Sequence, residues 1–272
     1  MNILLTGCSS GIGYFCAHEL AKNGYQVYAT CKEEKDVQRL QTEGLKAYKL
    51  DLRDSKSIAE ALAWVVMQTD GKIDVLFNNG AYGQPGAVED LKRSVLTEQF
   101  ETNVFGTQEL TNLVIPFMRK NGFGRVIYNS SVLGFVAMKY RGAYNASKFA
   151  IEGLCDTMRL ELKGSGVAVV LIEPGPIRSD FRKNALAKFK EHIDVEASAH
   201  KEIYKKTLQR LQGEGDAPFT LNPEAVYQVL IEAIKSKKPY ARYRVTIPTK
   251  LFSFLKRVLP TCMMDIILGR VD

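Results

Sequence analysis

Along the first two thirds of the chain, short apolar segments alternate with longer segments in which apolar residues recur every three or four positions. That spacing places apolar side chains on one helix face and predicts amphipathic helices at about 11–23, 33–43, 55–69, 91–119 and 143–163. The short segments are rich in β-branched residues and predict strands at 2–6, 26–30, 46–50, 73–77, 125–129 and 167–172.

These predicted strands are apolar throughout, which is typical of strands buried on both faces. Strands that alternate with helices pair in parallel through right-handed crossovers. The pattern therefore predicts an α/β fold: a single-domain, Rossmann-like, doubly wound parallel sheet with helices on both faces. No linker or repeat interrupts it, so we expect one domain over 1–272. Within it we expect a cofactor-binding and catalytic core at about 1–180, a substrate lid at about 180–222 and a tail at about 235–272.

The composition is that of an ordinary globular chain, with 46% hydrophobic and 25% charged residues among 272, and it excludes disorder, collagen and coiled coil. No apolar run approaches the roughly 18 residues of a membrane-spanning helix, and no basic segment precedes the first strand. We therefore expect a chain that is neither secreted nor threaded through a bilayer. Five cysteines without a C-x-x-C pair and three histidines predict a reducing cytoplasm and no metal site.

The net charge of +7 is concentrated near the C-terminus. Residues 232–272 contain nine Lys/Arg and three Asp/Glu, a balance of +6 that leaves +1 for the rest of the chain. This distribution argues against nucleic acid as a partner of the whole chain. Apolar and basic residues are interleaved in the tail, which fits an interfacial helix on anionic lipid or, as the preferred interpretation, packing on the domain or on a second subunit.

A glycine-rich turn follows the first predicted strand and leads directly into a helix. Its sequence is Thr6-Gly7-Cys8-Ser9-Ser10-Gly11-Ile12-Gly13. Glycines let the backbone turn sharply and let a phosphate approach the amide groups, while a helix N-terminus presents unpaired N–H donors. The turn therefore predicts a dinucleotide pyrophosphate site. Three glycines also occur in loops by accident, so other residues must support the prediction.

The end of the second predicted strand indicates which dinucleotide binds. An acidic residue there would bond the ribose 2′-hydroxyl, whereas a basic one accommodates a 2′-phosphate. Here the strand leads through Cys31 into Lys32, and the first acid is Glu33. The sequence favours NADP(H) over NAD(H), with Lys32, Ser9 and Ser10 as phosphate partners, although Lys32 also fits an ordinary solvated lysine.

Tyr144 and Lys148 are the candidate catalytic pair. A Tyr-x-x-x-Lys spacing arises by chance in a chain with 12 tyrosines, and a second pair, Tyr28 with Lys32, does occur. Four residues along a strand span about 13 Å, which is too far to share a proton. Four residues along a helix lie about 6 Å apart, so only the pair in the predicted helix 143–163 can meet at one site.

This pair suits a dehydrogenase. Hydride delivery to a carbonyl leaves an alkoxide that needs a proton, and a tyrosine whose pKa is ordinarily near 10 exchanges one at neutral pH only if a nearby cation favours its phenolate. Lys148 can supply that charge and can also hold the nicotinamide ribose.

Together these motifs resemble the short-chain dehydrogenase/reductase (SDR) family. The resemblance covers about residues 2–180, and the matching residues occur in the family's order: Thr6, Gly7, Gly11, Gly13, Asp51, Asn78, Asn79, Gly80, Asn103, Ser131, Tyr144, Lys148, Pro174 and Gly175. The C-terminal third, with Val245-Thr246 before an apolar and basic tail, is similar to the 17-beta-hydroxysteroid and retinol dehydrogenases and to bacterial aldehyde reductase-like oxidoreductases.

The resemblance implies a role for each matching residue. Tyr144 would act as the acid-base, and Lys148 would be its electrostatic partner. Ser131 would donate a hydrogen bond to the alkoxide, with Ser130 as the second choice. Asn103 would interrupt its helix and hold a water that relays protons. Asp51 would bond the adenine edge, and Asn78 would cap the pocket, although a helix cap or turn explains Asp51 or Asn103 taken singly. The remaining implied cofactor contacts are Gly7, Gly11, Ile12, Gly13, Leu52, Asn79, Gly80, Tyr144, Lys148, Pro174, Gly175, Ile177 and Ser179.

Two positions depart from the family pattern. The usual Asn-Asn-Ala-Gly is here Asn78-Asn79-Gly80-Ala81, which would move the glycine-permitted backbone conformation by one position. The usual threonine after Pro174-Gly175 is Ser179, which keeps a hydroxyl for the nicotinamide carboxamide.

The lid and one loop are expected to meet the substrate, because doubly wound sheets bind ligands beyond the C-terminal ends of their strands. Apolar lid residues would either cover an apolar substrate or simply anchor the lid; they are Phe181, Leu186, Phe189, Ile193 and Tyr204. The other wall would be lined by Phe135, Val136, Met138 and Tyr140.

The sequence therefore predicts an NADP(H)-dependent oxidoreductase that interconverts an apolar aldehyde or ketone and the corresponding alcohol by hydride transfer, with Tyr144 as the acid-base. A non-catalytic dinucleotide-binding redox sensor or interaction module is the alternative, and the intact Ser131, Tyr144 and Lys148 set disfavours it. Epimerisation or dehydration on the same fold would need acid-base groups that we do not identify. The resemblance also implies a homodimer or homotetramer built on the fifth and neighbouring helices.

Overall fold

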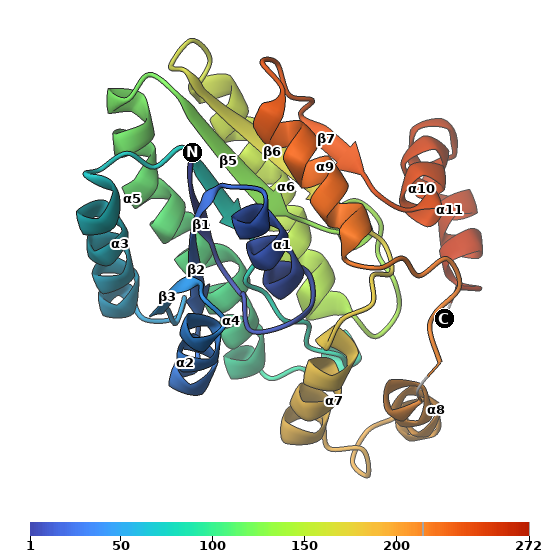
Figure 1. The fold of residues 1–272 in the computed structure, drawn as a ribbon. Coiled ribbons are helices and arrows are strands. Elements are labelled where there is room, and N and C mark those ends of the chain that lie inside the picture. Colours follow the sequence, from blue (N-terminus) through green and yellow to red (C-terminus); the bar gives the residue numbers. More distant parts are fainter. Residues whose placement is uncertain (214, 272) are drawn as a thin grey trace.

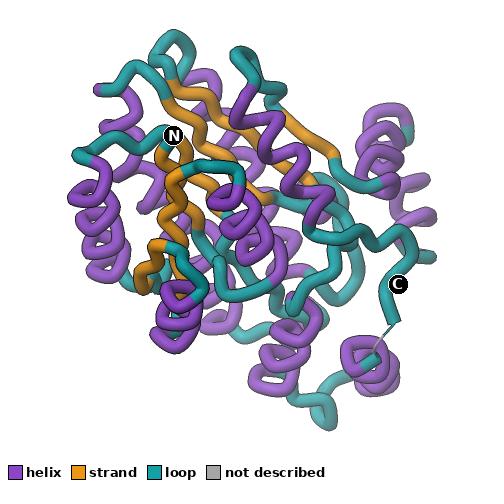
Figure 2. The backbone as a smooth tube through the Cα atoms, in the orientation of Figure 1, coloured by secondary structure: helices purple, strands orange, loops and turns teal. Residues whose placement is uncertain are grey.

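One parallel sheet forms the centre of the molecule. The computed structural model describes residues 1–213 and 215–271; residues 214 and 272, which fall in the predicted lid and tail, lie outside the described residues. Seven strands follow the order β3-β2-β1-β4-β5-β6-β7, and every adjacent pair is parallel (Figure 2). They are β1 (Asn2–Leu5), β2 (Gln26–Cys31), β3 (Lys46–Lys49), β4 (Val75–Asn78), β5 (Gly124–Asn129), β6 (Val167–Glu173) and β7 (Arg242–Arg244).

Helices cover both faces of this sheet (Figure 1). One apolar layer holds α1 (Gly11–Lys22), α2 (Glu34–Thr42) and α9 (Glu224–Lys235), and the other holds α3 (Ser55–Thr69), α5 (Thr107–Lys120) and α6 (Gly142–Glu161). Along β1, Ile3 and Leu5 face the first layer and Leu4 faces the second. Alternate side chains thus enter two apolar layers, which explains why the strands are apolar throughout and confirms the predicted fold.

The single helix predicted over 91–119 is divided in the structure. It consists of α4 (Arg93–Phe100), a π-helical segment (Glu101–Gly106) and α5. A Cβ at Gly106 would overlap the backbone carbonyl of Leu52, so this part of the helix lies directly against the loop after β3. Asn103 is in the π-helical segment, where the widened turn breaks the regular hydrogen bonding, as the family resemblance implied.

The segment expected to form the lid contains α7 (Phe181–His192) and α8 (Lys201–Gln212). Phe189, Ile193 and Tyr204 are buried in one apolar cluster with Ala87 and other residues of the body. The Tyr204 hydroxyl also accepts a hydrogen bond from the Ala87 N–H (2.8 Å). These three lid residues therefore anchor the lid.

Part of the tail packs on the domain, as in the interpretation preferred from the sequence. Its first part forms β7, which the sequence did not predict, at the edge of the sheet beside β6. Arg242 and Arg244 of β7 both pair with Glu173 of β6, which is buried (N to O distances 3.0 and 3.2 Å). Part of the positive charge of the tail is therefore neutralised internally. Helices α10 (Ile247–Val258) and α11 (Thr261–Leu268) follow.

Among the described residues, no helix combines the length and apolar character needed to cross a membrane. All five cysteines are free thiols, four of them buried.

Candidate active site

The glycine-rich turn between β1 and α1 forms a cradle. Gly7 and Gly11 have φ of +69° and +55°, in the left-handed region that glycine adopts without strain. A Cβ at Gly13 would overlap the carbonyl of Gly7, so the start of α1 lies against the turn only because this residue is glycine. Ser10, at the N-cap of α1, makes no side-chain capping bond. The first amide groups of α1 thus remain for an anion, and the turn fits a pyrophosphate.

Gly80 has a different role from the one expected from the exchange in Asn78-Asn79-Gly80-Ala81. Among the described residues, Gly80 is not one of the glycines with positive φ, so no left-handed conformation has moved to it. A Cβ on Gly7 would lie 2.7 Å from the Gly80 Cα, and the Gly80 N–H donates to Thr6 Oγ1 (2.8 Å). Gly80 therefore lies in close contact with Gly7 of the phosphate turn, and a Cβ on Gly80 would approach the side chains of Leu52 and Thr6 at 3.1 and 3.2 Å.

Asn79 connects the strands behind the turn. Its amide nitrogen donates to the carbonyls of Thr6 and Gly7, and its Oδ1 accepts from Asn129 Nδ2 (2.9 Å). Asn78 instead donates to Thr111 Oγ1 on α5 (2.8 Å) and is buried. The side chain of Asn79, rather than that of Asn78, reaches the turn.

Three cations surround the expected adenosine end. Lys32 is half exposed and its Nζ lies 3.9 Å from Asp51 Oδ2, while Arg53 binds both oxygens of Asp51. Burial opposes ionisation of Asp51, but the Arg53 hydrogen bonds and the Lys32 charge hold its pKa below the usual value. Arg39 on α2 donates to the carbonyl of Ser9 in the turn. Neither Arg39, on α2, nor Arg53, in the loop after β3, was identified from the sequence, because the local sequence around each gives no signal of the residue that it contacts.

Tyr144 and Lys148 lie one turn apart at the start of α6, so the structure brings the predicted pair together. The Lys148 Nζ lies 5.6 Å from the centre of the Tyr144 ring and donates to the carbonyl of Asn129 at the end of β5 (2.7 Å). Lys148 is almost fully buried. Its ammonium is therefore held at the C-terminal edge of the sheet, where the site was expected.

Of the two neighbouring serines, Ser131 is the one that contacts Tyr144. A hydrogen bond from Ser131 acts on the Tyr144 hydroxyl and lowers its pKa. Ser130 is turned the other way and donates to Glu152 Oε1 (2.5 Å). The loop that follows is fixed by the Val132 N–H, which donates to the Pro174 carbonyl (2.8 Å). Ser131 thus lies beside the Tyr144 hydroxyl and Ser130 is bonded elsewhere, while the catalytic role of Ser131 stays a prediction.

Burial dominates the electrostatics of the pair. It raises the pKa of Tyr144 to about 12, against the lowering effects of the Ser131 hydrogen bond and the Arg141 charge. It also lowers the pKa of Lys148 to about 8, although the negative charge of Glu152 opposes this shift. In this structure, therefore, the lysine does not make the tyrosine acidic; both groups are pushed toward their neutral forms.

Asn103 is fixed behind Tyr144 by several hydrogen bonds. Its amide nitrogen donates to Ser147 Oγ (3.1 Å) and to the Tyr82 carbonyl (3.0 Å), and its Oδ1 accepts from the Tyr82 N–H (3.2 Å). Ser147 in turn donates to the carbonyl of Tyr144. Asn103 therefore ties the π-helical segment to the first turn of α6.

The segment after β6 closes the opposite side. A Cβ at Gly11 would lie 2.7 Å from the Cβ of Ser179, so Ser179 stands over the phosphate turn, with Ile177 beside it in the apolar layer of α1. A Cβ at Gly175 would overlap Thr246 Oγ1, so this glycine permits close packing with the start of α10. Predicted cofactor contacts from the start of the core, at Gly11, and from its end, at Ile177 and Ser179, therefore lie together.

The two walls proposed for the substrate are only partly as expected. Phe135, Val136 and Met138 pack in the same apolar cluster as Tyr144. Tyr140 lies instead in the lid cluster, with its ring against His200 and Tyr204. Phe181 is the apolar lid residue whose ring contacts Tyr144.

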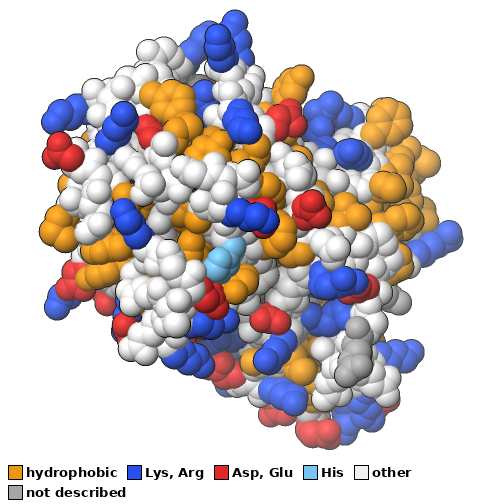
Figure 3. Space-filling model, viewed as in Figure 1, with side chains coloured by type: hydrophobic (Ala, Val, Ile, Leu, Met, Phe, Trp, Pro, Cys, Tyr) orange, Lys and Arg blue, Asp and Glu red, His pale blue; other side chains and the backbone are white. Residues whose placement is uncertain are grey.

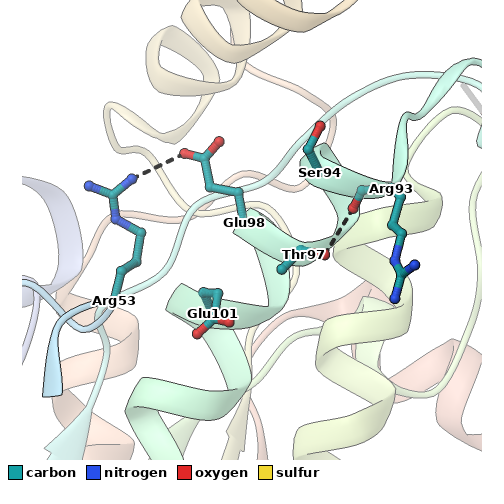
Figure 4. A pocket seen from close by; sticks show the side chains of 6 residues that line it. All are labelled: Arg53, Arg93, Ser94, Thr97, Glu98 and Glu101. Atoms are coloured by element: carbon teal, nitrogen blue, oxygen red, sulfur yellow. Dashed lines mark hydrogen bonds and ion pairs between the residues drawn. The ribbon is translucent and has the colours of Figure 1, made fainter.

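A separate surface pocket lies beside α4 (Figure 4). Arg53 approaches Glu98 across it (3.4 Å), and Thr97 donates to the carbonyl of Arg93. Its lining mixes acidic and basic side chains and includes none of Ser131, Tyr144 and Lys148. We assign no chemistry to it.

Comparison with known proteins identifies the family. The model of the short chain dehydrogenase family matches residues 1–190. The chain belongs to the short-chain dehydrogenase/reductase family. It is 38% identical over 267 residues to the uncharacterized oxidoreductase YbbO of Escherichia coli K12, covering 98% of this chain and 93% of YbbO. The chain is thus an SDR oxidoreductase, as the motifs indicated.

Two further proteins extend the comparison. Human 17-beta-hydroxysteroid dehydrogenase type 1 is 35% identical to this SDR chain over 257 residues, covering 90% of this chain and 77% of that protein. The solved structure of F189W actinorhodin polyketide ketoreductase with NADPH superposes with a TM-score of 0.72 at 25% identity, covering 90% of this chain and 95% of that one. The family and fold assignments therefore agree with each other over nearly the whole chain.

Proposed function

We propose that this SDR enzyme uses NADP(H) to interconvert an apolar aldehyde or ketone and the corresponding alcohol. The observation that carries the proposal is the convergence of three elements at one edge of the sheet: the glycine turn after β1, Ser131 after β5, and Tyr144 with Lys148 at the start of α6. A binding module needs the first element, whereas proton chemistry needs the other two.

The residues around the turn fit a nicotinamide dinucleotide. The amide groups at the start of α1 would hold the pyrophosphate, and Lys32, with Ser9, Ser10 and Arg39 nearby, would hold a 2′-phosphate. Asp51 and Leu52 would border the adenine, and Ser179 would meet the carboxamide. When bound, the cofactor supplies or accepts a hydride. The actinorhodin polyketide ketoreductase structure, solved with NADPH, supports a nicotinamide dinucleotide as cofactor. The preference for NADP(H) over NAD(H) rests on Lys32.

Proton transfer would be carried out by Tyr144. Because burial raises its pKa to about 12, Tyr144 holds its proton at neutral pH and is ready to donate it to the alkoxide formed from a carbonyl. Ser131 would donate a hydrogen bond to the same oxygen. The hydrogen bond to the Asn129 carbonyl fixes the position of the Lys148 Nζ. Asn103, through its hydrogen bond to Ser147, fixes the helix segment that would support a proton relay.

An apolar substrate is supported by the surroundings of Tyr144. Phe135, Met138 and Phe181 present apolar surface around the phenol, and human 17-beta-hydroxysteroid dehydrogenase type 1 is a relative of 35% identity. A carbonyl with an apolar body would place its oxygen between Ser131 and Tyr144 and its body against these side chains.

We infer two further properties of the assembly and location. Leu113 on α5 and Phe149 and Leu160 on α6 are exposed, which supports a dimer or tetramer built on these helices. Five free thiols favour a reducing compartment such as the cytoplasm.

The test is NADPH oxidation by the full chain with a panel of aldehydes, ketosteroids and retinal, compared with Tyr144→Phe. We expect turnover with at least one apolar carbonyl and a loss of at least about a hundredfold in the variant. The variant should still quench or enhance NADPH fluorescence on binding. Full activity of Tyr144→Phe would refute the mechanism, and no turnover with retained NADPH binding in the unmodified protein would favour the redox sensor.

A further inference from the structure

Helix α10 has an apolar face that no described residue covers. Ile247, Leu251, Phe254 and Val258 are 65%, 51%, 62% and 56% exposed. Their spacing of four, three and four residues places them on one side of the helix. Met263 and Ile266 of α11 are exposed as well. Figure 3 shows apolar side chains gathered where Figure 1 places these helices, with basic side chains beside them.

The opposite side of α10 is firmly packed on the enzyme. Phe252 and Met264 are buried in the cluster that contains Val132 and Leu133, next to Ser131. Lys256, which is itself exposed, donates to the carbonyl of Phe135 and so joins α10 to the loop after β5. Thr246 caps the helix by accepting from the Thr249 N–H. The exposed stripe is therefore the outer face of an ordered helix that forms part of the wall behind Tyr144.

The charge beside the stripe is positive. Lys250 and Arg257 are exposed and seven residues apart, so they share one flank of the apolar face. Between 246 and 271 the described residues include four basic side chains, and the one acid is Asp265. Unlike Arg242 and Arg244, which pair with Glu173, Lys250 and Arg257 lie outside the internal ion pairs of β7.

An apolar stripe with a basic flank distinguishes between two partners that could cover it, a second copy of the chain and a lipid surface. In a symmetric dimer through α10, an antiparallel pair would bring the two Lys250 and Arg257 flanks together, and like charges oppose such a contact. A parallel pair would separate the flanks but offer them no acidic partner from α10, which contains neither Asp nor Glu. An anionic lipid surface instead attracts both cations while it accepts the apolar side chains.

We propose that α10 and α11 form a peripheral membrane-binding element that lies in the interface of an anionic lipid bilayer. The stripe of Ile247, Leu251, Phe254 and Val258 would enter the boundary between headgroups and acyl chains, with Lys250 and Arg257 at the phosphates. Twelve residues of α-helix span about 18 Å, less than the hydrocarbon core of about 30 Å, so α10 lies along the surface.

The position of α10 beside the site also bears on catalysis, an inference that rests on the proposed function. Tyr144 shares an apolar cluster with Leu255 and Leu259 of the α10 region. A membrane-bound enzyme would therefore present its substrate wall close to the lipid, and apolar carbonyl compounds dissolved there would reach the site without crossing water.

The test is cosedimentation of the full chain with vesicles of phosphatidylcholine, with and without phosphatidylglycerol. We expect binding to increase at least about tenfold with the anionic lipid and to fall as salt is raised. Leu251→Ser/Phe254→Ser and, separately, Lys250→Glu/Arg257→Glu should each reduce binding at least about tenfold. Matched controls are Met67→Ser on α3, which is 72% exposed, and Lys22→Glu/Lys56→Glu, whose side chains are 76% and 83% exposed; neither should reduce it.

Two readouts separate this proposal from its competitors and from the proposed function. Sedimentation velocity without lipid should give the same oligomer for the α10 variants and the unmodified protein, and turnover of a water-soluble aldehyde should be retained. Absence of vesicle binding, or binding that both α10 variants leave unchanged, would overturn the membrane proposal. An oligomer that dissociates in Leu251→Ser/Phe254→Ser, without vesicle binding, would assign the stripe to a second copy.

Discussion

The Phe181 ring lies edge-on against the Tyr144 ring, with 5.2 Å between their centroids. Phe181 is the first residue of α7, so the lid begins with the side chain that covers the candidate catalytic phenol. Space for this ring exists because residue 83 is glycine: a Cβ there would lie 2.6 Å from Phe181 Cζ. Gly83, Phe181 and Tyr144 therefore form one packed set.

We predict that Phe181→Ala shifts substrate preference toward bulky carbonyl compounds. Removing the ring enlarges the space beside Tyr144, so the ratio of kcat/KM for a bulky over a small aldehyde should rise about tenfold. Gly83→Val should shift the ratio in the same direction, because its side chain displaces Phe181. The measurement is a steady-state comparison of the two aldehydes.

The double variant tests the contact itself. Since both changes act on the position of one ring, their effects should be far from additive. Met67→Ala on α3, where the side chain is 72% exposed, is the control and should leave the ratio unchanged. If the effects of Gly83→Val and Phe181→Ala are additive, the packing of Phe181 against Gly83 does not determine the preference for substrate size.

Lys32→Glu should reduce kcat/KM with NADPH by about 10- to 100-fold, because a charge-assisted contact to the 2′-phosphate is replaced by repulsion. With NADH, which lacks that phosphate, the change should be much smaller. Lys35→Glu, an exposed lysine of α2, is the matched control. Equal losses with both cofactors would remove Lys32 from the phosphate site and leave Arg39, which contacts Ser9, as the candidate.

The fold was predictable because its strongest determinants are local. The all-apolar segment at Ile3, Leu4 and Leu5 requires burial on both faces, and the glycine turn specifies the transition from β1 to α1. Tyr144 and Lys148 were predictable for the same reason, because four residues on a helix must lie on one side.

The parts that were missed depend on contacts between distant segments. Three residues make β7, and they form a strand by pairing with β6, where Arg242 and Arg244 also form ion pairs with Glu173, about 70 positions earlier. Likewise, Arg39 reaches Ser9 and Phe181 reaches Gly83 only through the tertiary arrangement. The expected effect of Lys148 on Tyr144 also depends on burial, which spacing alone does not reveal.

Lys148→Met should stabilise the protein while abolishing turnover. Burial lowers the pKa of Lys148 from its ordinary value of 10.5 to about 8, so folding at pH 7 works against an unfavourable buried charge. After allowance for the lost hydrogen bond to Asn129, we expect a gain of about 2 kcal/mol in the free energy of unfolding at pH 7. Urea unfolding measures it, with the exposed Lys120→Met as control.

The pH dependence of this gain has a definite sign. Between pH 8 and 10.5 the unfolded chain binds more protons at Lys148 than the folded protein, so the stability of the unmodified protein rises with pH in that window. The difference from Lys148→Met should therefore shrink as pH rises from 7 to 10. A difference that stays constant would show that Lys148 keeps its proton in the folded protein as fully as in the unfolded chain, so that burial does not lower its pKa.

Alcohol oxidation and carbonyl reduction should respond differently to pH between 6 and 8. Burial raises the pKa of Tyr144 to about 12, so the protonated phenol required for reduction is fully populated in this range and the reduction rate should be flat. Oxidation requires the phenolate, whose fraction increases about tenfold with each pH unit below the pKa, so kcat/KM for the alcohol should rise with a slope near one. Lys148, whose pKa is about 8, remains largely charged over most of this window and does not impose a second slope. An oxidation rate that levels off near pH 7 would mean that the bound cofactor lowers the pKa of Tyr144 by several units, and Lys148→Arg, which stays charged, would then show whether the ammonium causes it.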